Sequence, residues 1–334
     1  MELWYKLRNT SLSKYSIYFV LSFLFIACTL ANPNFLSVNN MTNISTQLAV
    51  TTILAFGATI LIICGMLDLS AGSVLALSGV FAVSAYKATG SIVIAVFVGI
   101  LTGVICNILN AVMIITFKAP PFIATLAMMA MARGVALQFT EGQNILQLDG
   151  FVVLGQGKIG FVPIPVLFLI GVGILTWYLL NHTRFGRSLY AVGGNEEASV
   201  ASGINVHRVK YTAFIINGVF VGLAGVLFMS RVNAGLPNGA INYEFTALTA
   251  AIIGGTSFSG GIGTAGGTLA GAFIVGFLDN IMNLKGVDSY IQQIIRGAII
   301  ALAVIYDIQS KNRRTKRTLG RIEDIRANNK TRSG

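Results

Sequence analysis

The chain has 334 residues, of which 54% are hydrophobic and only 10% are charged, and its formal net charge is +11. A soluble domain carries about 25% charged residues, so a chain this apolar has too little polar surface to face water on all sides. The composition excludes an ordinary soluble protein and predicts one that crosses a membrane several times. No polar stretch is long enough to form a second domain.

Ten apolar segments follow one another along the chain, and most approach the roughly 20 residues that a membrane-spanning helix needs. Their hydrophobic runs are continuous rather than alternating, which excludes a membrane β-barrel. The predicted fold is therefore an all-α polytopic membrane domain over residues 1–310, with about ten transmembrane helices, followed by a basic tail, 311–334. The segments cover residues 15–31, 48–67, 70–86, 91–117, 120–140, 162–180, 211–230, 245–259, 265–284 and 288–307.

Basic residues are distributed unevenly between the two sides that ten crossings would create. The side that holds both termini receives seventeen lysine and arginine residues, and the other side receives four. Because cytoplasmic loops carry an excess of these residues, both termini are predicted to be cytoplasmic. The tail could also be taken for a nucleic-acid patch, but membrane topology and anionic lipid explain it more simply. No nucleic acid is predicted as a partner.

Redox, metal and disulfide chemistry find no support in the sequence. The three cysteines, Cys28, Cys64 and Cys106, lie inside apolar segments and indicate no disulfide framework. The two histidines, His182 and His207, are far apart in one polar loop and do not have the spacing of a metal site. No cofactor or metal is predicted.

Residues 260–267 read GGIGTAGG and contain G-x-G-x-x-G, the pattern of a dinucleotide-binding turn. That turn needs a preceding strand within a soluble parallel sheet, whereas both flanks here are apolar membrane segments. The glycines are therefore interpreted as helix-packing residues, because small side chains let helix backbones approach closely. The chain also lacks a Walker A motif, so it is predicted to bind no ATP itself and not to be an enzyme.

Several ionisable and amide side chains lie within the apolar segments or at their ends. A charge at the bilayer centre costs roughly 2.5–3.5 kcal/mol on insertion scales, so these groups should face protein or a water-filled cavity. Two interpretations remain open: they line a translocation path, or they pair, as Asp279 with Arg133 or Arg296, while Asp68 caps the helix that begins near Ser70. The candidates are Asp68, Ser70, Arg133, Asp279, Asn280 and Asn283.

The longest polar stretch before the tail, residues 181–211, falls on the side predicted to be cytoplasmic. Asn195 is placed to cap a short helix with an acidic start, and Gly203 is placed to end it. The pattern predicts a helix that docks on a partner, and an ordinary solvated loop is the alternative. The small apolar face of this helix consists of Ala198, Val200 and Ala201.

The stretch TRFGRSLYAVGGNEEASVASGINVHRVK resembles the cytoplasmic coupling loop of bacterial ABC sugar-importer permeases, the ribose-type members of the branched-chain amino acid and sugar permease superfamily. Four further stretches fit in family order: LDLSAGSVLALSG, PPFIATLAMMAMARGVAL, YEFTALTAAIIGGTSFSGGIGTAGGTLAGAFIVGFLDN and GVDSYIQQIIRGAIIALAVIYD. Together the resemblance covers Asn34 to Asp307. Glu196 and Ser199 depart from the family pattern, and Asp279 stands where an amide is usual. The loop residues that match are Gly194, Asn195, Glu197, Ala198, Gly203 and Ile204.

The resemblance implies the permease subunit of an ATP-binding-cassette importer in the cell membrane, with ribose as the expected solute and alternating access as the mechanism. The implied partners are a second copy of the chain, cytoplasmic ATP-binding subunits that hydrolyse ATP, an extracytoplasmic sugar-binding protein and membrane lipid. Two alternatives remain open. One is a permease for branched-chain amino acids, and the other is an ion-coupled secondary transporter, which would need more titratable groups along its path.

Overall fold

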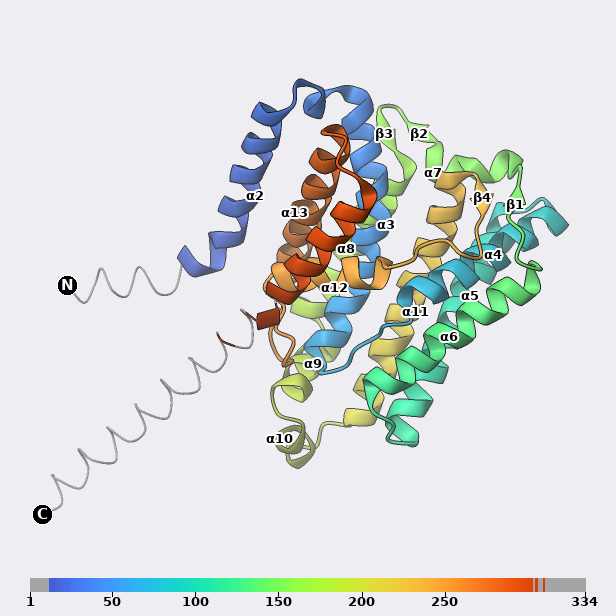
Figure 1. Ribbon diagram of the computed structural model, residues 1–334. Helices are drawn as coiled ribbons and strands as arrows, with labels where there is room; N and C mark the ends of the chain where they lie inside the picture. The colour runs from blue at the N-terminus through green and yellow to red at the C-terminus, as the bar shows by residue number, and fades with distance from the viewer. Residues whose placement is uncertain (1–11, 303, 306–308, 310–334) are drawn as a thin grey trace, which may run out of the picture.

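Apolar helices make up almost all of the structure, a computed structural model that describes residues 12–302, 304, 305 and 309 (Figure 1). Seven helices in this part of the chain are long and apolar enough to cross a membrane. The prediction of an all-α polytopic membrane protein is confirmed. These helices are α3 (Val38–Ile63), α4 (Ala71–Thr89), α5 (Ile92–Ala111) with the π-helical turn η2 (Val112–Thr116), α6 (Pro121–Phe139), α8 (Ile164–His182), α11 (Val206–Val232) and α13 (Ala265–Leu284).

The other three predicted segments also fall on helices, α2 (Leu12–Ala31), α12 (Tyr243–Ile253) and a last helix over residues 289–302. α12 has only 11 residues, which at 1.5 Å each cannot cross a core about 30 Å thick. The predicted span 245–259 is therefore wrong, because Gly255, with φ 85°, ends the helix early. A count of ten full crossings is not confirmed by the described residues.

Hydropathy also misplaced the start of α3, which begins at Val38 rather than at residue 48. The extra turns are polar, and Ser37 caps them by accepting a hydrogen bond from Asn40 N at 3.3 Å. A cap, rather than the edge of the apolar run, sets where this helix begins. The predicted boundary at residue 310 and the basic tail lie outside the described residues.

Short elements connect the long helices. Two antiparallel pairs of two-residue strands occur at the end of the bundle opposite α9 and α10 (Figure 1). The sequence analysis predicted none of these strands. The short elements are η1 (Pro33–Leu36), η3 (Asp149–Val152), α7 (Val153–Gln156), α9 (Arg184–Gly194), α10 (Glu196–Ala201), β1 (Ile145–Leu146) paired with β4 (Ala234–Gly235), and β2 (Lys158–Ile159) paired with β3 (Val162–Pro163).

The central helix, α11, packs against α3, α4 and α5. Its contact with α5 is made by glycines on both helices: a Cβ on Gly103 would lie 2.3 Å from Gly218 O, and one on Gly222 would lie 2.5 Å from Gly99 O. Because no side chain fits between them, the two backbones touch directly. Glycine at these positions holds the middle of the bundle together.

The glycines around residues 260–267 serve the same purpose. A Cβ on Gly267 would lie 2.1 Å from Gly254 O, and one on Gly271 would lie 2.1 Å from Ala250 O, so α12 and α13 meet backbone to backbone. The G-x-G-x-x-G residues form the turn that enters α13, and no parallel sheet precedes it in the described part of the chain. The helix-packing interpretation is confirmed.

Replacing Gly267 with leucine is expected to push α12 away from α13, because the added side chain would overlap the Gly254 carbonyl. The folded yield in detergent, measured by size-exclusion chromatography, should fall several-fold. Gly171→Leu in α8 is the matched control, since nothing lies within 4 Å of its Cβ position. Equal yields for the two variants would contradict the packing role of Gly267.

Candidate functional site

The polar segment between α8 and α11 folds into two short helices, α9 and α10, at one end of the bundle (Figure 1). Thr183 caps α9 by accepting a hydrogen bond from Gly186 N at 3.0 Å. Asn195 ends α9 and caps α10, accepting from Ala198 N at 2.9 Å. The predicted short helix and its Asn195 cap are confirmed.

α10 ends at Gly203, as predicted, with a φ of 79°. Gly203 N and Ile204 N donate hydrogen bonds of 2.9 and 3.0 Å to carbonyls of the last turn, which is a Schellman motif. At the other end of α10, Lys210 of α11 donates to both carboxylate oxygens of Glu196, at 2.8 and 2.7 Å. A helix of six residues is too short to be stable alone, and the Lys210–Glu196 ion pair fixes its first turn to α11.

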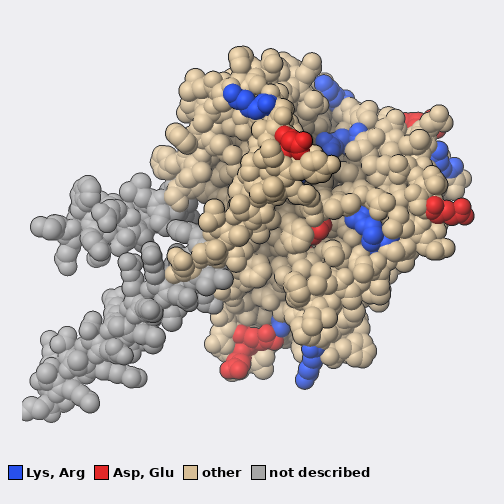
Figure 2. Space-filling model, in the orientation of Figure 1, with Lys and Arg blue, Asp and Glu red and all other residues tan. Residues whose placement is uncertain are grey.

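The outward side of α10 holds three apolar side chains beside the exposed Glu196 and Glu197. Val200 exposes 59% of its surface, and Ala198 and Ala201 are exposed as well, while Ser199 is buried against the bundle. Figure 2 shows this tip at the bottom of the molecule, with acidic and basic atoms close together and an uncharged surface directly above them. We call Ala198, Val200 and Ala201 the α10 patch. Nothing in the described part of the chain covers it.

The end of α9 packs on two other segments through backbone alone. Gly261 N donates a hydrogen bond of 2.9 Å to the carbonyl oxygen of Ile63, which is the last residue of α3. A Cβ on Gly193 would lie 1.7 Å from Ile63 O, and one on Gly260 would lie 2.7 Å from Gly193 O. Only glycine lets three segments meet so closely. We call Ile63, Gly193, Gly260 and Gly261 the glycine junction.

Tyr190 of α9 adds a side-chain link to the turn before α13. Its hydroxyl donates to Gly263 O at 2.7 Å. Burial raises the pKa of the Tyr190 phenol, so the hydroxyl keeps its proton at neutral pH and remains a donor. α10 is therefore joined to that turn through α9, by a hydrogen bond and by the glycine junction.

A buried polar cluster ties the α3–α4 connection to α5 and α11. Asp68 accepts hydrogen bonds from Ser70 N and Oγ and, at 2.8 Å, from Asn217 Nδ2. Asn217 Nδ2 also reaches Asn107 Oδ1 at 2.8 Å, and Asn110 Nδ2 donates to Ser70 Oγ at 3.0 Å. None of the five residues is more than 5% exposed. The arrangement is that of an internal network, in which buried polar groups supply one another's partners.

The N-cap interpretation of Asp68 is wrong. Ser70 occupies the N-cap position of α4 and makes no side-chain capping bond. Asp68 instead accepts from the Ser70 backbone before the helix begins and holds Asn217 across the bundle. The sequence analysis did not single out Asn217, although one amide in the middle of an apolar run is a signal for such a network.

Arg133 does not contact Asp279. Its Nη1 donates to the carbonyl oxygens of Pro237 and Gly239, at 2.5 and 2.9 Å. These carbonyls belong to the non-helical stretch between α11 and α12, which leads to the middle of the bundle, where α12 begins (Figure 1). Such backbone at membrane depth is tolerated only where protein covers it or where it lines a water-filled cavity. Arg133 therefore satisfies backbone groups that helix bonds do not.

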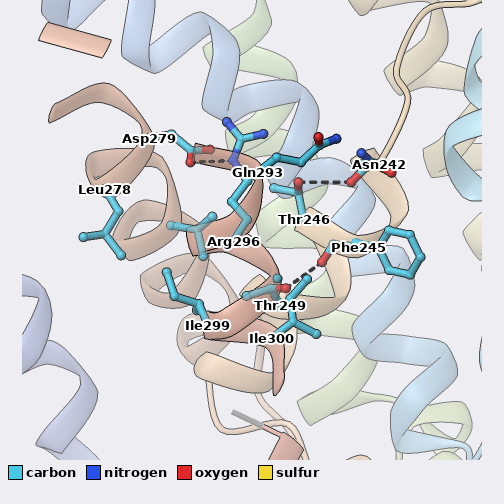
Figure 3. A pocket seen from close by; sticks show the side chains of 12 residues that line it. Asn242, Phe245, Thr246, Thr249, Leu278, Asp279, Gln293, Arg296, Ile299 and Ile300 are labelled. Carbon is cyan, nitrogen blue, oxygen red and sulfur yellow. Dashed lines mark hydrogen bonds and ion pairs between the residues drawn. The ribbon is translucent and has the colours of Figure 1, made fainter. Parts of the chain in front are cut away.

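Asp279 pairs with Arg296, one of the two partners that the sequence analysis considered. Arg296 Nε lies 2.8 Å from Asp279 Oδ1. The pair borders a cavity of about 200 Å³ between α12, α13 and the helix 289–302, shown in Figure 3. We call it the α12–α13 pocket. Its lining includes the α12 N-cap Asn242, Thr246 and Thr249 of α12, Asp279 of α13, and Gln293 and Arg296 of the last helix.

The remaining two candidates make contacts between helices outside this pocket. Asn280 and Asn40 exchange two amide hydrogen bonds, of 3.1 and 2.8 Å, which join α13 to α3. Asn283 accepts from Gln292 Nε2 at 2.8 Å. Of the six residues predicted to line a path or to be buried in pairs, only Asp279 lines the pocket. The sequence analysis missed Glu244, which is 6% exposed and lies against Gly72. It stands at the start of a half-helix, and this position is visible only in the folded structure.

Known proteins match this chain over nearly its whole length. Residues 40–304 match the family described as branched-chain amino acid transport system / permease component. The ribose import permease protein RbsC of Escherichia coli (strain K12) is 40% identical over 281 residues, 83% of this chain and 88% of that protein. RbsC of Bacillus subtilis (strain 168) is 38% identical over 287 residues, 85% and 89% of the two chains.

The L-arabinose transport system permease protein AraH of Escherichia coli (strain K12) is 35% identical over 304 residues, 90% of this chain and 93% of that protein. No solved structure matches the chain significantly. The family match runs from α3 into the last described helix and includes the α9–α10 segment. The chain therefore belongs to the branched-chain amino acid transport system permease family, as a multi-pass membrane permease subunit of an ABC importer.

Proposed function

We propose that this permease imports ribose and that separate cytoplasmic subunits, which bind and hydrolyse ATP, drive it by docking on α10. Permeases of this family work with an ATP-binding subunit and a substrate-binding protein and are not themselves catalytic. The observation that carries the choice of ribose is the similarity to ribose import permeases from two bacteria, at 38–40% identity. The similarity to AraH makes L-arabinose the second candidate.

The α10 patch supports the docking site. A short helix that holds alanine and valine side chains out toward solvent gains stability when another surface covers them. Its first turn is fixed to α11 by the Lys210–Glu196 ion pair, and Asn195 joins it directly to the end of α9. A partner that moves α10 would therefore move α9 with it.

The glycine junction supports a route for that movement. α9 touches α3 and the turn before α13 through backbone atoms, without flexible side chains between them. Tightly packed contacts of this kind transmit small shifts rather than absorbing them. We therefore expect displacement of α10 to reach α12 and α13, which line the pocket.

The remaining parts of the proposal concern assembly. The division into a permease domain, 1–310, and a cytoplasmic tail, 311–334, with both termini in the cytoplasm, is supported by the distribution of basic residues. A second copy of the chain is proposed as the partner within the membrane, surrounded by lipid. The partly exposed Arg296, which needs protein or water rather than lipid beside it, supports a covered face.

Uptake in a bacterial host that lacks its own pentose permeases tests the substrate. The chain is expressed with an ATP-binding subunit and a substrate-binding protein from the same organism, and uptake of labelled ribose, L-arabinose and leucine is compared. We expect ribose uptake to exceed that of the other two. Leucine uptake without ribose uptake would establish the amino-acid alternative instead.

A further inference from the structure

We propose that the α12–α13 pocket is a monosaccharide-binding subsite on the import path, in which the Asp279–Arg296 pair binds sugar hydroxyl groups. This inference rests on the proposed function as a sugar importer and assigns that function a place within the chain.

The size of the pocket suits a small solute. Its volume is about 200 Å³. Pockets for drug-sized ligands begin at about 300 Å³, so this one has room for a pentose and little more. Asp279 and Thr246 also line a neighbouring cavity of about 20 Å³, which is large enough for one ordered water.

The pocket lies in a region that must contact water or protein rather than lipid. The Arg296 side chain is 37% exposed, and a guanidinium carries its charge at every physiological pH. Lipid contact would be costly for it, so this side faces water or protein. The non-helical stretch that ends at Asn242, beside the pocket, independently requires the same surroundings. Both observations place the pocket against water or protein rather than lipid, as a site on an import path requires.

The polar groups of the pocket match hydroxyl chemistry. The ion pair uses Arg296 Nε and Asp279 Oδ1, and within the part of the chain that the structure describes the other guanidinium and carboxylate atoms make no hydrogen bond. One sugar hydroxyl can donate to the carboxylate while its neighbour accepts from the guanidinium, so two adjacent hydroxyls bridge the pair without breaking it.

The threonine hydroxyls of α12 complement the ion pair. Thr246 and Thr249 donate to carbonyl oxygens one turn earlier, at 3.2 and 2.7 Å, as the dashed lines in Figure 3 show. Their oxygens keep free lone pairs and are acceptors for a ligand. Ile299 and Ile300 supply apolar surface for the carbon skeleton. Donors, acceptors and apolar surface together are what a polyol requires.

The double variant Asp279→Asn/Arg296→Gln tests the site, because it removes both charges at similar volume and leaves neither one unpaired. Ribose binding to the purified chain is measured by equilibrium dialysis, alongside ATP-dependent uptake by the complete reconstituted complex. Loss of two hydrogen bonds to charged groups should weaken ribose binding about tenfold or more, and the uptake rate should fall. Association with the ATP-binding subunit and the folded yield should not change.

Asn40→Ser is the matched control, since it breaks another polar pair of α13, with Asn280, outside the pocket. It should bind ribose like the wild type. If the wild type takes up ribose and the double variant binds ribose as tightly as the wild type, the proposed site is wrong while the proposed substrate stands. Wild-type binding of leucine that the double variant loses also overturns it. If the wild-type complex takes up no ribose, the proposed substrate itself is wrong.

Discussion

Replacing Ala198 with glutamate is expected to abolish sugar uptake while the permease still inserts and folds. The residue is exposed in the α10 patch, so the added carboxylate meets solvent in the free chain and costs little there. Once a partner covers the patch, the same carboxylate is desolvated without a partner charge, which typically costs several kcal/mol. A pull-down with tagged ATP-binding subunit should recover at least tenfold less of the variant than of the wild type.

Ala198→Ser provides the control for this experiment, because it keeps a small neutral side chain at the same position. Its recovery and uptake should remain close to those of the wild type. Gly203→Val is a second lesion of the same element: valine tolerates the φ of 79° at this position poorly, so the end of α10 should distort. Full uptake and full recovery by Ala198→Glu would mean that α10 is not the docking element.

Replacing Gly193 with alanine is expected to uncouple the importer. The new Cβ would lie 1.7 Å from Ile63 O, so α9 must move away from α3 and from the turn before α13. The α10 patch itself is untouched, and the ATP-binding subunit should still be recovered in the pull-down. We expect uptake to fall at least tenfold, with ATP hydrolysis continuing without sugar transport.

Tyr190→Phe should have the same effect in milder form, because it removes only the 2.7 Å hydrogen bond to Gly263 O. Gly171→Ala is the control for adding a methyl group to a helix glycine with open space around it. The sugar transported per ATP hydrolysed separates coupling from general damage. Should Gly193→Ala keep the wild-type ratio, the glycine junction does not transmit the movement of α10.

Much of this arrangement could be predicted from residue patterns that act locally. Asn195 and Gly203 set the two ends of α10 through capping and left-handed backbone, and both positions were predicted from the sequence. Continuous apolar runs located a helix at every predicted segment. These features depend on neighbours within one or two turns, so a single sequence contains enough information to place them.

The contacts between distant segments could not be predicted in the same way. Asp68 looked like a helix cap, but its partner across the bundle is Asn217, 149 positions away. Arg133 and Asp279 carry opposite charges in apolar segments but do not pair with each other. Arg133 donates to two backbone carbonyls instead, and Asp279 forms an ion pair with Arg296. Hydropathy also did not reveal that α12 is a half-helix, because residues 245–259 include no charged side chain that would mark the glycines where it ends.

Reconstitution into sealed proteoliposomes measures most directly whether separate ATP-hydrolysing subunits drive this permease through α10. Ribose accumulation is followed with binding protein outside and ATP-binding subunit and ATP inside, for the wild type and Ala198→Glu. We predict accumulation that requires ATP and the ATP-binding subunit and that Ala198→Glu loses. Accumulation driven by an ion gradient without ATP, or full ATP-driven accumulation by Ala198→Glu, would contradict this account.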